Sequence, residues 1–462
     1  MSGAEDNNAR FLESPYRIRL VSVLFVVCAF NFADRAVFSA LAQTIKVDLQ
    51  LSDLQLGLLQ GIVFAVLYAA VGLPIGLLAE RLKRTHILAV ATAVWSAATV
   101  ATGMAGSFVQ LAAARLLVGM GEAGFMPTTA SMVGDVTRRN RRASTMSLIL
   151  IGTPTGYLVG APLAGYLSDS FGWRAAFLAF GIPGVIVALA LPFLLKEPPR
   201  GLADGEVTRR QAPPIRDFLR AVWGNPTLKW VIAGGSLAGF GMTSISQFLA
   251  VFLARTHELS VREAAAAYGS VSGISLAIGL LTGGMVTDAL SRRDPRWPAW
   301  GAAIGLAMAV PTYLLAFHAG SLWSAIALLL AAGAVLLLYY APTTGMIQNL
   351  LPPQMRASGI ALYSLLYTLI GSGFGPVFVG GASDFFGARS YAGNYGVDCP
   401  NGLPAAGASQ LQALACADAS ASGLTYALSL SVLIFVISAV CFLRAAPGLK
   451  ARAQAESAQT NA

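Results

Sequence analysis

Residues 56–79 read LGLLQGIVFAVLYAAVGLPIGLLA, a run without a single charged side chain. A helix of about 20 apolar residues is needed to cross the roughly 30 Å hydrocarbon layer of a bilayer. The run therefore predicts a transmembrane helix. The whole chain is 56% hydrophobic and 11% charged, whereas soluble proteins carry about 25% charged residues. This composition excludes an ordinary water-soluble protein.

Runs of similar length and polarity recur along the chain, both before residue 196 and after residue 229. We predict an all-α polytopic membrane protein with twelve transmembrane helices in two six-helix pseudo-repeat halves. The expected spans are residues 20–43, 56–79, 87–105, 110–133, 145–167, 175–195, 230–253, 264–287, 299–317, 322–350, 359–381 and 424–443.

Lys and Arg are concentrated in the segments that would face one side of the membrane. If both termini are cytoplasmic, the opposite side holds only Lys46, Arg174, Arg255, Arg262 and Arg389. Because short cytoplasmic loops are enriched in basic residues, we expect a multi-pass protein of the cell inner membrane with both termini cytoplasmic. The net charge of +9 is then explained by the basic residues of the cytoplasmic segments, and no nucleic-acid partner is expected.

A charged, proline-containing segment separates the two sets of spans and cannot itself cross a membrane. We predict an N-terminal half at 17–195, a cytoplasmic linker at 196–229 and a C-terminal half at 230–444. The cytoplasmic tails are residues 1–16 and 445–462.

The two halves share short motifs in the same order, which indicates a duplicated architecture. An even number of spans in each half keeps the repeats parallel, so we expect one half to rock against the other during alternating access. The RAS of 142–144 recurs at 356–358, Pro162 matches Pro376, the SDSFGWR of 168–174 recurs as SDFFGAR at 383–389, and the pattern G-x-x-x-acid-x-L-x-R occurs at 76–84 and 284–292.

Residues 76–84, GLLAERLKR, resemble the signature loop of major facilitator transporters. The resemblance implies a mechanical role, because an acid beside a basic cluster makes a latch that alternates with transport state. A merely basic loop is the alternative. The gating residues expected from the two copies are Gly76, Glu80, Arg81, Arg84, Asp288 and Arg292.

The spans at 145–167 and 359–381 are rich in glycine and each contains a proline. Both are similar to the antiporter motif of the same superfamily. Small residues allow close helix packing in lipid, so ordinary tight packing explains the pattern as well as a role in exchange does.

Charged residues inside the membrane are the strongest functional signal, because burying an ionised group there costs several kcal/mol unless it is paired or hydrated. Asp34 and Arg35 lie in the first span, and Arg115 and Glu122 lie two helical turns apart in the fourth. No His lies inside a span, so we expect Asp34 and Glu122 to carry protons, with Asp34 as the coupling site. A permanent salt-bridge scaffold is the alternative.

The motif NFADR at 31–35, together with RLLVGMGEA at 115–123 and the RAS of 142–144, resembles bacterial members of the spinster family. The resemblance implies a proton-driven transporter of lysophospholipids or sphingosine-phosphate-like amphiphiles. Arg35, Arg115 and Asn31 would then hold the substrate head group or pair with the acids. No cofactor or metal is expected, the driving force being the proton gradient. The expected partners are the substrate, membrane lipids and H⁺, with the chain acting as a monomer.

A symporter of small organic anions such as sugar acids is the main alternative, because that branch of the superfamily carries a similar Asp-Arg pair. The second half favours a lipid, because its spans offer no charged side chain to a polyhydroxylated anion. Candidate cavity residues are Tyr68, Gln247, Tyr363 and Tyr367, although such polar residues also join helices together. An enzyme is not expected, since the sequence shows no nucleophile with a base and no set of metal ligands.

The chain has four cysteines. Cys28 and Cys441 fall within predicted spans and read as small apolar residues. Cys399 and Cys416 fall in the long external loop before the last span, where an oxidising compartment permits a disulfide.

Overall fold

The computed structural model describes residues 11, 14–79, 81–138, 141–200, 202, 215–352 and 354–460. Within these ranges the chain is helical and forms no strand. Twelve helical stretches are long and apolar enough to cross a membrane. The predicted all-α fold with twelve spans is therefore confirmed.

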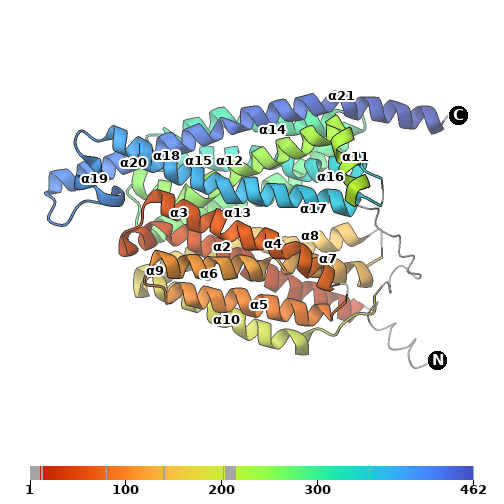
Figure 1. Cartoon of the computed structure of the whole chain (residues 1–462), viewed down its shortest axis with the longest axis horizontal. Helices are drawn as coiled ribbons and strands as arrows, with labels where there is room; N and C mark the ends of the chain where they lie inside the picture. The colour runs from red at the N-terminus through yellow and green to blue at the C-terminus, as the bar shows by residue number, and fades with distance from the viewer. Residues whose placement is uncertain are drawn as a thin grey trace. The chain divides into compact units, whose positions relative to one another are not determined.

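The elements of the first six spans are drawn from red to yellow in Figure 1. Three of these spans are interrupted, at Gly61, at Ala123 to Gly124 and at Ile151, where two helices meet end to end. The elements are α2 (Ser14–Leu49), α3 (Asp53–Gln60), α4 (Ile62–Ala79), α5 (Arg84–Gly103), α6 (Phe108–Glu122), α7 (Phe125–Val136), α8 (Arg142–Leu150), α9 (Gly152–Phe171) and α10 (Trp173–Leu194).

The remaining elements begin with a short helix inside the predicted linker, α11 (Ile215–Gly224), while residues 201 and 203–214 of that linker lie outside the described residues. They continue with α12 (Pro226–Thr256), α13 (Val261–Ser291), α14 (Trp297–Phe317), α15 (Leu322–Leu336), η2 (Leu337–Tyr339), α16 (Tyr340–Leu350), α17 (Arg356–Leu366), η3 (Tyr367–Phe374), α18 (Gly375–Ser390), α19 (Tyr395–Asp398), η4 (Pro400–Gly402), α20 (Gln410–Val432) and α21 (Ile434–Thr460).

The chain forms two compact units, and two short segments depart from sequence order. Unit 1 contains residues 1–49, 63–209 and 259–273. Unit 2 contains residues 50–62, 210–258 and 274–462. The start of the second span thus belongs to unit 2, and the start of the eighth span belongs to unit 1. These are matching elements of the two repeats.

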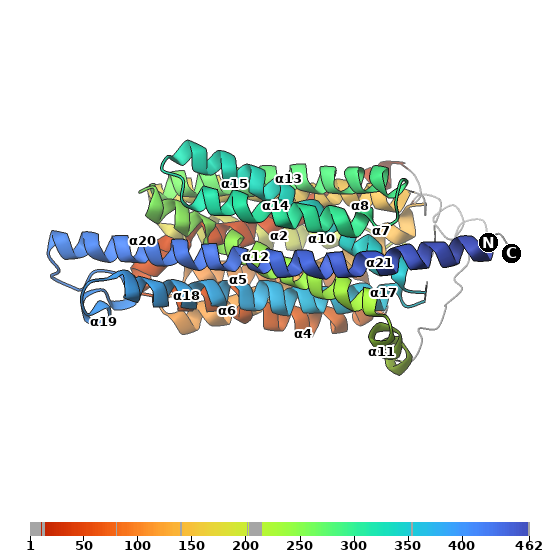
Figure 2. The ribbon, with the colours of Figure 1, turned by 90° about the horizontal axis from the view of Figure 1, so that it is seen from above.

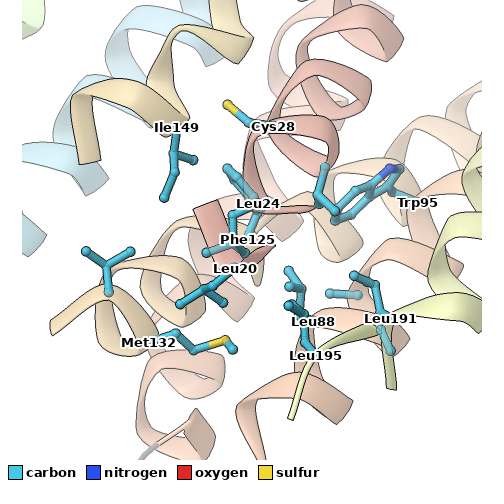
Figure 3. Close-up of a cluster of buried hydrophobic side chains, with 14 of the residues drawn as sticks. Leu20, Leu24, Cys28, Leu88, Trp95, Phe125, Met132, Ile149, Leu191 and Leu195 are labelled. Atoms are coloured by element: carbon cyan, nitrogen blue, oxygen red, sulfur yellow. The ribbon is translucent and has the colours of Figure 1, made fainter. Parts of the chain in front are cut away.

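Unit 1 is held together by close helix packing around α2. A Cβ atom on Gly156 of α9 would come within 2.7 Å of the Ala29 carbonyl oxygen, so only glycine permits this approach. Figure 3 shows the buried cluster beside it, in which Leu24 of α2 lies with Trp95 of α5 and Phe125 of α7. The glycines of the fifth span therefore have a packing role.

Unit 2 follows the same pattern. A Cβ on Gly423 of α20 would lie 2.5 Å from the Ser383 carbonyl oxygen of α18. Figure 2 shows α20 and α21 continuing one another as a single long rod, with α19 beside the start of α20. A disulfide joins Cys399 to Cys416.

The position of that disulfide corrects one expectation. Cys416 does not lie in the loop, as the sequence suggested, but in α20, which begins at Gln410. The helix starts early because the Ser409 hydroxyl accepts from the Gln412 backbone N–H while the Gln412 side chain accepts from the Ser409 N–H. A capping box satisfies two free N–H groups at a helix N-terminus and so favours a helix start at this position.

Candidate functional site

The first intramembrane acid, Asp34 on α2, is almost completely buried, with 4% of its surface exposed. Its Oδ2 atom accepts a hydrogen bond of 3.1 Å from the Thr99 hydroxyl of α5. Its Oδ1 atom has no hydrogen-bond partner in the part of the chain that the structure describes. The carboxyl group is therefore only partly satisfied, and a protonated carboxyl is far cheaper to bury in that setting than an ionised one.

The second acid, Glu122 at the end of α6, forms an ion pair with the neighbour of Asp34. Arg35 Nε donates to Glu122 Oε2 at 2.6 Å, and the Glu122 side chain is fully buried. The Arg35 guanidinium also lies over the rings of Phe32, Phe64 and Tyr68, at 5.0–5.4 Å. Aromatic faces attract a cation, so Arg35 is held by a carboxylate and by three rings.

Arg115 on α6 shares one aromatic neighbour, Phe64, with Arg35. Its guanidinium is 4.5 Å from the centre of the Phe38 ring and 5.2 Å from that of Phe64. The residue is 4% exposed. Asn31, 2% exposed, has a side-chain Nδ2 without a hydrogen-bond partner among the described residues. A buried amide donor of this kind is suited to receive an acceptor group.

The structure thus brings together the residues that the sequence selected in the first half. Asp34, Arg35 and Asn31 come from α2, while Arg115 and Glu122 come from α6. Sequence reasoning missed Thr99, because a threonine in an apolar helix has no distinguishing signal. Its partner is fixed only when α5 packs against α2.

Of the cavity candidates, Tyr68 belongs to this cluster through its contact with Arg35. Tyr363 and Tyr367 form a cluster within unit 2, with ring centres 5.9 Å apart. The Tyr363 hydroxyl is buried and has no hydrogen-bond partner among the described residues, whereas that of Tyr367 contacts the Met242 sulfur at 3.7 Å. Gln247 is half-buried in α12.

The tyrosine pair stands where the helix changes its hydrogen-bonding pattern. Tyr367 opens η3, which is a π-helical segment. Within it, the Gly371 carbonyl oxygen accepts a 2.7 Å hydrogen bond from the Thr243 hydroxyl. π-Helical turns are rare and occur frequently at functional sites, so this part of unit 2 is a second candidate contact region.

The expected gating motif forms a buried ionic cluster around Arg84, at the end of unit 1 where the linker begins. Arg84, 1% exposed, pairs with Asp135 of α7 and donates to Glu197 Oε1 at 2.7 Å and to the Pro198 carbonyl at 2.7 Å. Burial alone would raise the pKa of Glu197, but hydrogen bonds from the Thr85 backbone N–H and from Arg84 hold that pKa below its usual value.

The other gating residues are placed less centrally. Arg81 and Arg292 are exposed, and Gly76 lies in α4 with room beside it. Glu80 lies outside the described residues, and so does the side chain of Asp288.

A further charged cluster, which the sequence analysis did not select, lies within unit 2 at the end that holds α19. Arg255 of α12 donates from both terminal nitrogens to Asp53 of α3, each at 2.7 Å. Ser383 donates to Asp53 at 2.6 Å, and Asp384 accepts from the backbone N–H groups of Asp53 and Leu54. The repeated Ser-Asp motif was the available signal, since its second copy caps α3.

Tyr395 of α19 lies next to this cluster. Burial and the nearby negative charge of Asp53 raise the pKa of Tyr395 to about 12. In η4, which follows α19, the Asn401 side chain donates to the Gln50 carbonyl at 2.9 Å. The disulfide-linked loop is thus fastened to the start of α3.

Comparison with known proteins agrees with this architecture. Residues 23–376 match the Major Facilitator Superfamily. An MFS-type efflux pump of Mycolicibacterium smegmatis is 32% identical over 79% of this chain and 84% of its own length. The spinster homolog 1 of Xenopus tropicalis is 24% identical over 80% of this chain and 73% of its own length. A hexuronate transporter of Bacillus subtilis is 29% identical over 61% and 66%.

A solved structure is also similar over nearly the full length. A bacterial homolog of the human lysosomal transporter spinster, in an inward-facing and unoccupied conformation, superposes with a TM-score of 0.83 at 29% identity. The match covers 95% of this chain and 98% of that one. Together with the paired acids and arginines on α2 and α6, these similarities establish that the chain belongs to the Major Facilitator Superfamily of transporters and resembles its spinster members.

Proposed function

We propose that this protein is a proton-coupled secondary transporter that moves a lipid-like amphiphile, such as a lysophospholipid or a sphingosine-phosphate-like molecule, by alternating access. The observation that carries the proposal is the unequal treatment of two buried acids. Glu122 has a charged partner, Arg35, whereas the donor that contacts Asp34 is the neutral Thr99 hydroxyl, and each acid has one carboxyl oxygen without a hydrogen-bond partner among the described residues. An acid in this condition is suited to take up and release a proton during the cycle.

The head group would be held by the arginines of unit 1. Arg35 is the more accessible of the two, since its side chain is 25% exposed, and a planar guanidinium binds phosphate or carboxylate oxygens in a fork. When Glu122 is protonated, Arg35 becomes available to such an anion. Asn31 would add a neutral donor.

The tail would be accommodated by the second half. Residues 230–254, 264–287, 322–350 and 359–382 contain no Lys, Arg, Asp or Glu. Two phenols of this half, Tyr339 and Tyr367, contact the Met242 sulfur. Such a surface is suited to an acyl chain and a glycerol-like linker rather than to several carboxylate and hydroxyl groups.

A sugar acid is the second candidate substrate, and the hexuronate transporter of Bacillus subtilis supports it, as does a probable galactarate/D-glucarate transporter of the same organism. The Arg35–Glu122 pair could hold a sugar carboxylate as readily as a phosphate. The two candidate substrates differ in what they need from unit 2: a lipid tail needs an apolar surface, whereas a sugar acid needs polar partners for its hydroxyl groups.

The test is uptake into proteoliposomes of radiolabelled lysophosphatidylethanolamine and, separately, radiolabelled glucuronate, with and without an imposed proton gradient. We expect gradient-driven movement of the lysophospholipid only. If only glucuronate moves, the lipid proposal fails. Asp34→Asn should abolish gradient-driven accumulation while leaving exchange of bound substrate measurable. Full accumulation in this variant would remove Asp34 from the coupling role.

Orientation and assembly complete the proposal. The excess of Lys and Arg in the tails and in alternate loops supports cytoplasmic termini in the inner membrane. All of the residues named for coupling and head-group binding belong to one unit of one chain, so a monomer would suffice.

A further inference from the structure

The Thr99 hydroxyl faces two acceptors but has only one proton to give. Its Oγ1 atom lies 3.1 Å from Asp34 Oδ2 and 3.0 Å from the Trp95 carbonyl oxygen, one turn earlier in α5. Thr99 is 3% exposed, so water does not compete freely for it. A hydroxyl has one O–H donor and two acceptor lone pairs, and it can therefore satisfy only one of these acceptors at a time.

We propose that Thr99 is a positioning residue for the coupling proton, and that its hydroxyl turns between Asp34 and the Trp95 carbonyl as Asp34 changes protonation state. The inference rests on the proposed function of Asp34. When Asp34 is ionised, Thr99 donates to Oδ2. When Oδ2 carries a proton, the carboxyl O–H donates to Thr99 Oγ1, and the Thr99 proton turns to the Trp95 carbonyl.

The step is balanced and needs only the proton gradient. A hydronium ion transfers its proton to the Asp34 carboxylate and leaves as water, forming one O–H bond and breaking one. No atom of Thr99 is gained or lost, because only its hydroxyl rotates. Both protonation states of Asp34 thus keep a hydrogen bond without movement of either helix.

Thr99 is distinguished by its hydrogen bond to Asp34 Oδ2, and the titratable groups nearby come from several helices. Arg35 lies on the same helix, and Glu122 and Arg115 come from α6, while Tyr68 of α4 and Tyr157 of α9 lie near Arg35. The one ionisable side chain of α10 is Arg174, which pairs with Asp48. These groups set the local field, whereas Thr99 touches the carboxyl oxygen directly.

The chain offers matched controls on the same helix. Thr102 and Thr92 are also buried and donate to the carbonyl one turn earlier, at 3.0 Å to Ala98 and 2.8 Å to Leu88. In the part of the chain that the structure describes, neither hydroxyl donates to a carboxylate. Thr102→Val therefore removes the same kind of hydroxyl, with the same change in shape and helix propensity, but without the contact to Asp34.

The experiment measures lysophosphatidylethanolamine counterflow in proteoliposomes at equal pH on both sides, as a function of pH. Thr99→Val should raise the pH of half-maximal exchange by about 0.5–1 unit, because a hydrogen bond to the ionised form is stronger than one to the neutral form. Thr99→Ser should restore the wild-type profile, and Thr102→Val should not move it. Infrared difference spectra should show the carbonyl band of protonated Asp34 shifted in Thr99→Val.

Each failure points to a different claim. An unmoved pH profile in Thr99→Val, or an equal shift in Thr102→Val, overturns the role of Thr99. If Thr99→Val does not fold, Thr99→Cys keeps a weak donor of similar size and should give an intermediate shift, and an unshifted profile there overturns the role as well. If Asp34→Asn retains full gradient-driven accumulation, it is the proposed function that fails.

Discussion

Two ion pairs that begin on α2 differ in burial, and their expected contributions to stability differ accordingly. Arg35 pairs with Glu122, whose side chain is fully buried, while Asp48 pairs with Arg174 at 2.7 Å with more than two-fifths of each side chain exposed. Removing one partner of a buried pair leaves the other charge uncompensated, whereas exposed pairs are screened by water. The same chemistry is therefore expected to matter near the middle of the helix and hardly at its C-terminal end.

Glu122→Gln is expected to lower the free energy of unfolding by about 3 kcal/mol, because it leaves the Arg35 charge inside the membrane. Arg35→Gln combined with Glu122→Gln should cost less than the sum of the single changes. Asp48→Asn is the control and should cost less than about 1 kcal/mol. Thermal unfolding of the purified protein in detergent measures all four variants, and strict additivity of the double variant would contradict the pairing.

Glu197 in the Arg84 cluster gives a prediction about pH. Its folded pKa lies below the ordinary value of 4.5, so its ionised form stabilises the folded state. That stabilisation is complete above pH 4.5 and is lost as the pH falls through the lower folded value. The difference in melting temperature between wild type and Glu197→Gln should be constant from neutral pH down to about 5 and shrink below 4.5. A melting-temperature difference that grew on acidification would contradict the predicted direction of the effect.

At the scale of elements, helix glycines of the fourth and fifth spans differ in how closely another helix approaches them, and the sequence alone does not show this difference. Gly156 of α9 touches the backbone of α2, whereas Gly134, on the preceding α7, has nothing within 4 Å of an added Cβ. Both lie inside helices, where alanine is the better helix former. Tertiary packing alone decides which of them tolerates a side chain.

Gly156→Ala is expected to destabilise the protein by about 1–3 kcal/mol and to reduce transport, because a methyl group would force α9 away from α2. Gly134→Ala should instead leave stability unchanged or raise it by about 0.5–1 kcal/mol. Thermal unfolding together with lysophospholipid counterflow distinguishes the two. A neutral Gly156→Ala would mean that the close approach of α9 to α2 is not required.

At the scale of the whole molecule, the division into units does not follow the chain. Residues 50–62 belong to unit 2, although the same span continues as α4 in unit 1. Residues 50–62 are held in unit 2 by the ion pair of Asp53 with Arg255 and by the hydrogen bonds that Asp384 accepts at the start of α3. Local opening of this segment should therefore depend on unit 2.

Arg255→Ala is expected to increase amide hydrogen exchange at residues 50–62 and around Ser383, since it leaves Asp53 buried without its cation. Exchange at residues 63–79 should stay unchanged. Arg389→Ala, an exposed arginine of the same α18, is the control and should alter neither region. Equal increases along the whole of 50–79 would show that helix continuity, rather than unit membership, governs the opening.

The sequence alone determined the membrane fold, the twelve spans, the duplication and the four intramembrane charges, because apolar length, composition and the cost of a buried charge are local properties. Only the tertiary structure decided that Arg35 pairs with Glu122, that Thr99 is the hydroxyl on Asp34, and that Asp53 joins Arg255. These depend on which helices pack together and which donors then face which acceptors, and such contacts join residues far apart along the chain.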